Sequence, residues 1–190
     1  LNAIGSRPEA TRNYGELVEP PRPLANARFV FADGKALQWE DADWSWTMFA
    51  LTGPGCADAC LARIDELRRA RLSLNQNADR VRVSVLDDAL PAARPAALAP
   101  VVAARDADGV LDALRPGAGE VAVAIADPHG FLAMRYAAGY DASRLRKDLV
   151  RLPRLRWADP WWRRTRFDGP IISGMRLRFR PAGHGGDNKD

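Results

Sequence analysis

The chain has only two cysteines, Cys56 and Cys60, and both lie in the stretch LTGPGCADAC. They are four positions apart, so in a helix their sulfur atoms would share one face. Such a pair could close an intrachain disulfide, exchange disulfides with another protein, or hold a soft ion such as Cu(I). Zinc prefers four ligands, and the sequence offers no second cysteine or histidine cluster. The interpretation without chemistry is that two small apolar residues simply pack on a helix.

The segment around the cysteines predicts a strand, a tight turn and then a helix. Residues 46–51 are a buried-strand run that ends in TGPG, and apolar residues then recur every three or four positions up to Leu74. We therefore expect a helix over 57–74, with Cys56 at its N-terminus and Cys60 one turn inside. The free N–H groups and the dipole of a helix N-terminus favour a thiolate, which lowers the pKa of a thiol placed there.

The remaining elements are indicated by apolar residues at strand or helix intervals, bounded by turn residues. They are hairpins at 28–39 and 120–136, a strand at 81–85, short helices within 91–100 and 106–117, and a closing helix at 141–152. This order predicts an α/β fold, a thioredoxin-like mixed sheet flanked by helices on both faces, with an N-terminal β-hairpin.

Three parts are expected in the 190 residues. Residues 1–27 carry four prolines, which predicts an extended lead-in or linker. Residues 28–152 are expected to form the thioredoxin-like domain. Residues 153–190 are expected to be a basic, Trp/Arg-rich tail that is partly disordered. The tail holds nine Lys or Arg against four Asp, which gives it a net charge of +5. Because the whole chain has a net charge of +4, residues 1–152 together carry −1. No nucleic-acid-binding module accompanies this charge, so no nucleic acid is expected as a partner.

No apolar run is long enough to predict a transmembrane span. The first residue is Leu rather than Met, which we interpret as the start of a processed or truncated product that once followed a signal peptide or membrane anchor.

Other enzyme classes fit the sequence poorly. His129 is expected as an exposed residue in the turn of the second hairpin, away from the cysteines, and His184 lies in the glycine-rich end, so a Ser-His-Asp hydrolase is disfavoured. No phosphate loop or dinucleotide fingerprint is present. A peroxiredoxin would place a threonine three residues before its reactive cysteine, whereas Thr52 is four before Cys56. A thioredoxin would have two residues between its cysteines.

The stretch WTMFALTGPGCADACLARIDELRRA resembles the active-site segment of the Sco/SenC proteins, the thioredoxin-fold copper chaperones of cytochrome c oxidase assembly. Those proteins also place a Cys-x-x-x-Cys after a hydrophobic strand and ahead of a helix. The stretches RFVFADGKALQWEDADW, DRVRVSVLDD and VAVAIADPHGFLAMRY are similar to their other elements, in order. The resemblance implies that Cys56 and Cys60 are copper or redox thiols. It also implies a membrane-anchored protein that faces the periplasm.

This chain departs from the Sco/SenC pattern at two places. The family's third copper ligand is a histidine just before the late hairpin, and here that place falls near Gly119-Glu120, with no histidine. Leu61 stands where family members often have proline after the second cysteine. Two thiolates alone can bind Cu(I), but loss of the histidine favours thiol–disulfide exchange, which needs only the sulfur atoms.

We therefore expect an envelope protein on the periplasmic side of the bacterial inner membrane that assists maturation of the cytochrome c oxidase copper site. It would act by thiol–disulfide exchange, with Cys56 attacking and Cys60 resolving, or by Cu(I) transfer with both as metal ligands. The expected partner is the copper-site subunit of the oxidase or another thiol protein. The alternative is a non-catalytic thioredoxin-like scaffold that binds an assembly partner, so whether the protein is an enzyme stays open.

Overall fold

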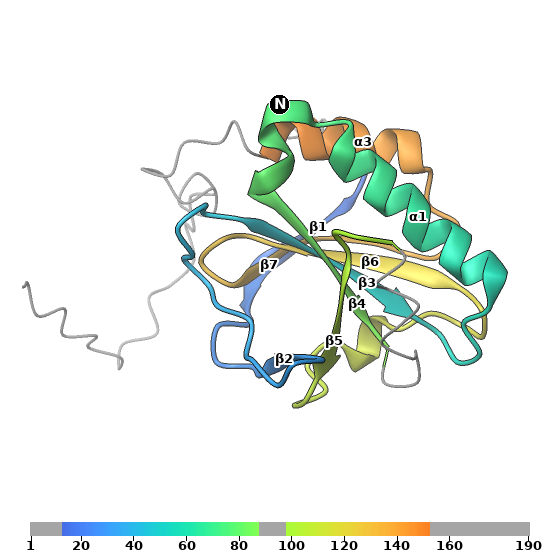
Figure 1. The fold of residues 1–190 in the computed structure, drawn as a ribbon, viewed down its shortest axis with the longest axis horizontal. Coiled ribbons are helices and arrows are strands. Elements are labelled where there is room, and N and C mark those ends of the chain that lie inside the picture. Colours follow the sequence, from blue (N-terminus) through green and yellow to red (C-terminus); the bar gives the residue numbers. More distant parts are fainter. Residues whose placement is uncertain (1–12, 88–97, 153–190) are drawn as a thin grey trace, which may run out of the picture.

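The computed structural model describes residues 13–87 and 98–152, and within them seven strands form one mixed sheet in the order β1-β7-β6-β3-β4-β5-β2 (Figure 1). The strands are β1 (Glu16–Pro23), β2 (Phe29–Phe31), β3 (Trp46–Thr52), β4 (Val81–Leu86), β5 (Val102–Asp106), β6 (Val121–Ala126) and β7 (Phe131–Tyr136). The helices are α1 (Asp58–Leu72) and α3 (Ala142–Arg151), with short 3₁₀ helices η1 (Asn75–Arg80) and η2 (Asp112–Leu114).

The centre of the sheet is wholly buried, which explains why its strands are continuous apolar runs. β3 runs parallel to β4 and antiparallel to β6, with Thr52 opposite Val121 and Thr47 opposite Ala126. The end of β3, after which the cysteines follow, therefore lies beside the start of β6. The turn between β6 and β7 lies at the other end of the sheet.

The helices α1 and α3 lie side by side on one face of the sheet (Figure 1). Ile64 and Leu67 of α1 and Leu145 and Leu149 of α3 are buried in one cluster with side chains of the strands. The predicted mixed sheet with flanking helices is confirmed. The two long helices share one face, however, and the opposite face is covered in the described part of the chain by loops and the short η2.

Most predicted elements are present. The first hairpin is short: Val30 bridges Ala36, and the N–H of Gly34, which has a φ of +83°, donates to the Phe31 carbonyl at 2.9 Å. The expected helix within 106–117 is the single turn η2, and the one within 91–100 lies largely outside the described residues. None of the described helices is long and apolar enough to cross a membrane.

β5 was not predicted from the sequence. It pairs with β2 at the edge of the sheet. Its five residues do not alternate between apolar and polar side chains, because its buried positions are occupied by Ala104 and the acidic Asp106. The Asp106 carboxylate accepts the N–H of Leu111 at 2.8 Å, so a polar contact replaces the apolar one that a strand pattern would show.

The first described strand is fastened to the domain by a buried carboxylate. Oδ2 of Asp148, on α3, accepts the N–H groups of Tyr14 and Gly15 at 2.8 and 2.9 Å and the hydroxyl of Tyr136 at 2.6 Å. A Cβ on Gly15 would lie 2.5 Å from the Tyr136 ring, so a larger residue there would have to displace that ring. The segment expected to be extended thus becomes an edge strand, β1, which pairs antiparallel with β7.

Two tyrosines on this side of the molecule predict a loss of stability at alkaline pH. Burial raises the pKa of Tyr140 to about 12. Burial and the hydrogen bond to Asp148 raise the pKa of Tyr136 as well. An unfolded chain would lose both phenolic protons near pH ~10. These groups should leave the free energy of unfolding unchanged below pH ~10 and lower it progressively as the pH rises toward about 12.

Urea denaturation at a series of pH values from about 8 to about 11 would measure this dependence. A variant with both Tyr136→Phe and Tyr140→Phe should show a flatter decline over the same range. An equally steep decline in that variant would contradict the assignment to these two phenols.

Candidate redox site

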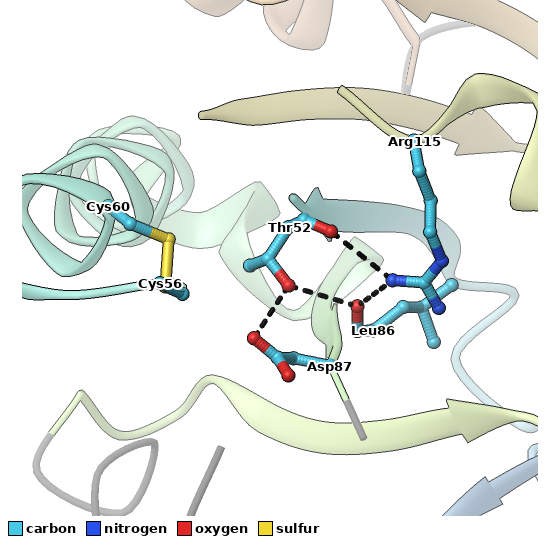
Figure 2. The surroundings of a disulfide bond; sticks show 6 residues. All are labelled: Thr52, Cys56, Cys60, Leu86, Asp87 and Arg115. Atoms are coloured by element: carbon cyan, nitrogen blue, oxygen red, sulfur yellow. Dashed lines mark hydrogen bonds between the residues drawn. A yellow bond between two sulfur atoms is a disulfide. The ribbon is translucent and has the colours of Figure 1, made fainter. Parts of the chain in front are cut away.

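Cys56 and Cys60 are joined in a disulfide, with their Cα atoms 5.2 Å apart (Figure 2). Cys56 lies in the loop after β3, and Cys60 lies in the first turn of α1. The Cys60 residue is 1% exposed, whereas Cys56 is half-buried. The two cysteines therefore differ in access, and Cys56 is the one that a thiol from outside can approach.

The helix α1 begins at Asp58, one residue later than the sequence pattern predicts. Its N-cap, Ala57, has no side-chain hydrogen bond to the first turn, so the first N–H groups of α1 receive no cap from that residue. Free N–H groups and the helix dipole favour negative charge near the helix start. Both therefore favour the thiolate form of Cys56 once the disulfide is reduced.

The loop that carries the cysteines is docked on the loop 117–120, which precedes β6. The N–H of Gly53 donates to the carbonyl of Glu120 at 3.0 Å, and the N–H of Gly119 donates to the carbonyl of Pro54 at 2.8 Å. A Cβ on Gly53 would lie 1.7 Å from the carbonyl oxygen of Gly117. Only glycine fits at position 53, and this close approach fixes where the cysteine loop starts.

A polar network lies beside the disulfide, at the ends of β3 and β4 (Figure 2). The hydroxyl of Thr52 donates to the carboxylate of Asp87 at 2.7 Å. Nη1 of Arg115 donates to the carbonyl oxygens of Leu86 at 2.8 Å and Thr52 at 3.3 Å, and its Nε donates to Oδ1 of Asp112 at 3.0 Å. The sequence analysis did not single out these network residues as part of the site. The positions of Thr52 and Asp87 at the ends of two predicted parallel strands were an available signal.

The described residues place no histidine beside the cysteines as a third ligand of the kind that the Sco/SenC resemblance implies. The loop 117–120 does face the cysteine loop, but its acidic residue, Glu120, uses its carboxylate to accept the N–H of Gly117 at 3.1 Å. Within residues 13–87 and 98–152, no three His, Cys, Asp or Glu side chains are grouped so that they could hold a metal ion. The donor set is two sulfur atoms, which suits two-coordinate Cu(I) after reduction of the disulfide.

His129 lies in the turn between β6 and β7, at the end of the sheet away from the cysteines, as predicted. It is more buried than expected, since its side chain is 28% exposed. Its Nδ1 lies 2.8 Å from Oε1 of Glu40, and its ring packs edge-on against Trp44, with 5.4 Å between ring centroids. These contacts explain the burial of His129 by packing of the loop before β3. His184 lies outside the described residues.

A family model described as "Transmembrane-like, thioredoxin-like, C-terminal domain" matches residues 46–156, more than half of the chain. The chain belongs to this family. The match begins at β3 and includes both cysteines. A comparison with curated proteins found no match to this sequence.

Solved structures with low sequence identity share the fold. Arabidopsis thaliana ScoI with copper bound is 15% identical, with a TM-score of 0.52 over 75% of this chain and 99% of that one. Yeast Sco1 with copper bound is 11% identical, with a TM-score of 0.53 over 75% and 93%. A putative thioredoxin from Neisseria meningitidis is 14% identical, with a TM-score of 0.52 over 73% and 95%. The predicted thioredoxin-like fold is confirmed, and Sco proteins are among the structures that share it.

Proposed function

We propose that this protein is a thiol–disulfide oxidoreductase of the bacterial cell envelope that assists maturation of the cytochrome c oxidase copper site. The observation that carries the proposal is the disulfide between half-buried Cys56 and buried Cys60 at the junction of β3 and α1. Disulfide exchange needs one accessible sulfur and a second within bridging range, and this pair supplies both.

The oxidase role and the location rest on further support. The sequence resembles the Sco/SenC proteins around the cysteines, and the fold is similar to that of plant and yeast Sco structures. Disulfides persist in oxidising compartments such as the bacterial periplasm, which supports a protein on that side of the inner membrane. A membrane anchor would keep it close to an oxidase subunit.

In the reductive direction, the chemistry needs only the two sulfur atoms and an external electron donor. The Cys56 thiolate attacks a disulfide of the partner, forms a mixed disulfide and releases the partner's other sulfur as a thiolate, which takes up a proton. The Cys60 thiolate then attacks the sulfur of Cys56, so the mixed bond breaks and the partner leaves as a dithiol. Two electrons have passed to the partner, and a donor dithiol must later return two electrons to the Cys56–Cys60 disulfide.

Cu(I) transfer is the second candidate function. It is favoured by the soft thiolate donors that Cys56 and Cys60 become on reduction, and by the copper bound in the plant and yeast Sco structures of similar fold. In this function both residues would hold Cu(I) as cargo for the copper-site subunit, without an imidazole ligand.

A direct test mixes the reduced protein, without oxygen, with the disulfide form of a soluble copper-site domain of the oxidase. Alkylation and mass spectrometry count the thiols on each chain, and we expect two thiols to appear on the partner for each Cys56–Cys60 disulfide formed. The matched control is the variant with Cys56→Ser and Cys60→Ser. A parallel titration with Cu(I) tests the second function, which predicts one-to-one binding that Cys56→Ser abolishes. If no thiols appear on the partner and no Cu(I) binds, both functions are wrong. Oxidase assembly supported by the double variant would then identify a non-catalytic scaffold.

A further inference from the structure

We propose that Arg115 is a positioning residue for the Cys56–Cys60 pair. Its side chain holds the cysteine loop in a geometry that favours the disulfide over the dithiol. The inference rests on the proposed thiol–disulfide exchange and names a residue that regulates it. Arg115 lies between η2 and β6, and Figure 2 shows its side chain reaching the ends of β3 and β4, with Thr52 between it and the disulfide.

The guanidinium of Arg115 joins three segments that are far apart in the sequence. Its Nη1 donates to the carbonyls of Thr52 and Leu86, the last residues of the two central parallel strands, and both residues are buried. A buried carbonyl at a strand end needs a donor, and a charged donor makes a stronger hydrogen bond than a neutral one. Asp112, in η2, accepts the Nε–H and holds the guanidinium in this orientation.

The segment 115–119 runs alongside the start of the cysteine loop. Arg115 contacts Thr52, Gly117 lies against Gly53, and the N–H of Gly119 donates to the carbonyl of Pro54. The contacts at Gly53 and Pro54 join backbone groups to backbone groups, whereas the contact at the Thr52 carbonyl is made by the side chain of Arg115. Arg115 is therefore the contact that a substitution can remove while the backbone contacts stay in place.

Loosening the loop should act on the reduced form more than on the oxidised form. Reduction breaks the S–S bond and adds two electrons and two protons, after which only the surrounding structure keeps the sulfur atoms together. In the oxidised form, the disulfide itself restrains the segment between Cys56 and Cys60. Without Arg115 the reduced loop gains conformational freedom, because fewer contacts order it. The disulfide should then be easier to reduce.

The test uses the full chain at equilibrium with dithiothreitol, which is oxidised to its cyclic disulfide as the protein disulfide becomes a dithiol. Arg115→Met should raise the equilibrium constant for reduction about tenfold, which corresponds to about 30 mV for a two-electron couple. Arg115→Lys keeps the charge and should give an intermediate value. The matched control, Arg28→Met, removes an exposed arginine that lies 3.1 Å from Asp108, outside the cysteine loop, and should leave the constant unchanged.

A purely structural arginine would stabilise the oxidised and reduced proteins equally, so its loss would lower both free energies of unfolding and leave the reduction equilibrium unchanged. That result in folded Arg115→Met would overturn the proposal. If Arg115→Met does not fold, an unchanged constant in Arg115→Lys overturns it instead. If the unsubstituted protein cannot be cycled between disulfide and dithiol, the proposed exchange function itself fails, which is a separate outcome.

Discussion

The Cys60→Ser variant is expected to accumulate as a mixed disulfide through Cys56 and to lose catalytic turnover. In the unsubstituted protein, Cys60 resolves the mixed disulfide from within the same molecule, with its Cα atom 5.2 Å from that of Cys56. Without it, a thiol from solution must do so. Turnover should fall on the order of a hundredfold or more, because the effective concentration of a well-placed intramolecular group far exceeds that of millimolar free thiol.

An aromatic disulfide that releases a coloured thiolate provides the measurement. Reduced protein should release two equivalents and retain no adduct, whereas Cys60→Ser should release one equivalent and keep one adduct, visible by mass spectrometry. Cys56→Ser should react slowly, since the remaining Cys60 is buried. Ala59→Ser, an exposed change in the same helical turn, is the matched control and should behave as the unsubstituted protein. Faster reaction of Cys56→Ser than of Cys60→Ser would reverse the assigned roles.

The placement of the cysteines could be predicted because it depends on local patterns. A strand buried on both faces is a continuous apolar run, the Gly-Pro-Gly after Thr52 cannot continue it, and the helix after Cys56 repeats apolar residues every three or four positions. The hairpin around 127–130 and the N-cap Asp141, whose carboxylate accepts the N–H groups of Ser143 and Arg144, are equally local.

The surroundings of the cysteines could not be predicted, because they depend on contacts between distant segments. Arg115 acts on Thr52 and Leu86, which precede it by 63 and 29 residues, and nothing in the residues next to Arg115 indicates those carbonyls. The requirement for glycine at position 53 likewise arises only when Gly117 lies against it. Hydrophobic periodicity predicts which face of a helix or strand is buried. It does not predict which polar side chain forms a hydrogen bond with the carbonyl groups at the end of a strand.

The absence of a histidine near Gly119-Glu120 has a physical consequence for the site. The loop 117–120 still contacts the cysteine loop through backbone hydrogen bonds. The two loops are therefore packed together, but the loop 117–120 offers no imidazole as a ligand. Two thiolates are sufficient for disulfide exchange, whereas a Cu(I) ion held by them alone lacks a third ligand. For this reason we propose thiol–disulfide exchange ahead of copper transfer.

The largest expected loss of stability comes from Asp148→Ala. One oxygen of this buried carboxylate accepts hydrogen bonds from the N–H groups of Tyr14 and Gly15 and from the hydroxyl of Tyr136. Each buried donor left without an acceptor costs about 1–3 kcal/mol, so the free energy of unfolding should fall by about 3 kcal/mol after water satisfies the more exposed groups. The anchor matters because β1 contains Pro20, Pro21 and Pro23, which have no N–H to donate to β7.

Urea unfolding with the disulfide intact would measure this loss. Asp148→Asn keeps an oxygen that can accept and should lose less stability than the alanine variant. Asp108→Ala, at a carboxylate that pairs with exposed Arg28, should lose less than about 1 kcal/mol. Hydrogen exchange adds a local readout, since amides of β1 should exchange faster in Asp148→Ala while those of β2, at the opposite edge, should not. Equal losses from Asp148→Ala and Asp108→Ala would show that the carboxylate does not anchor β1.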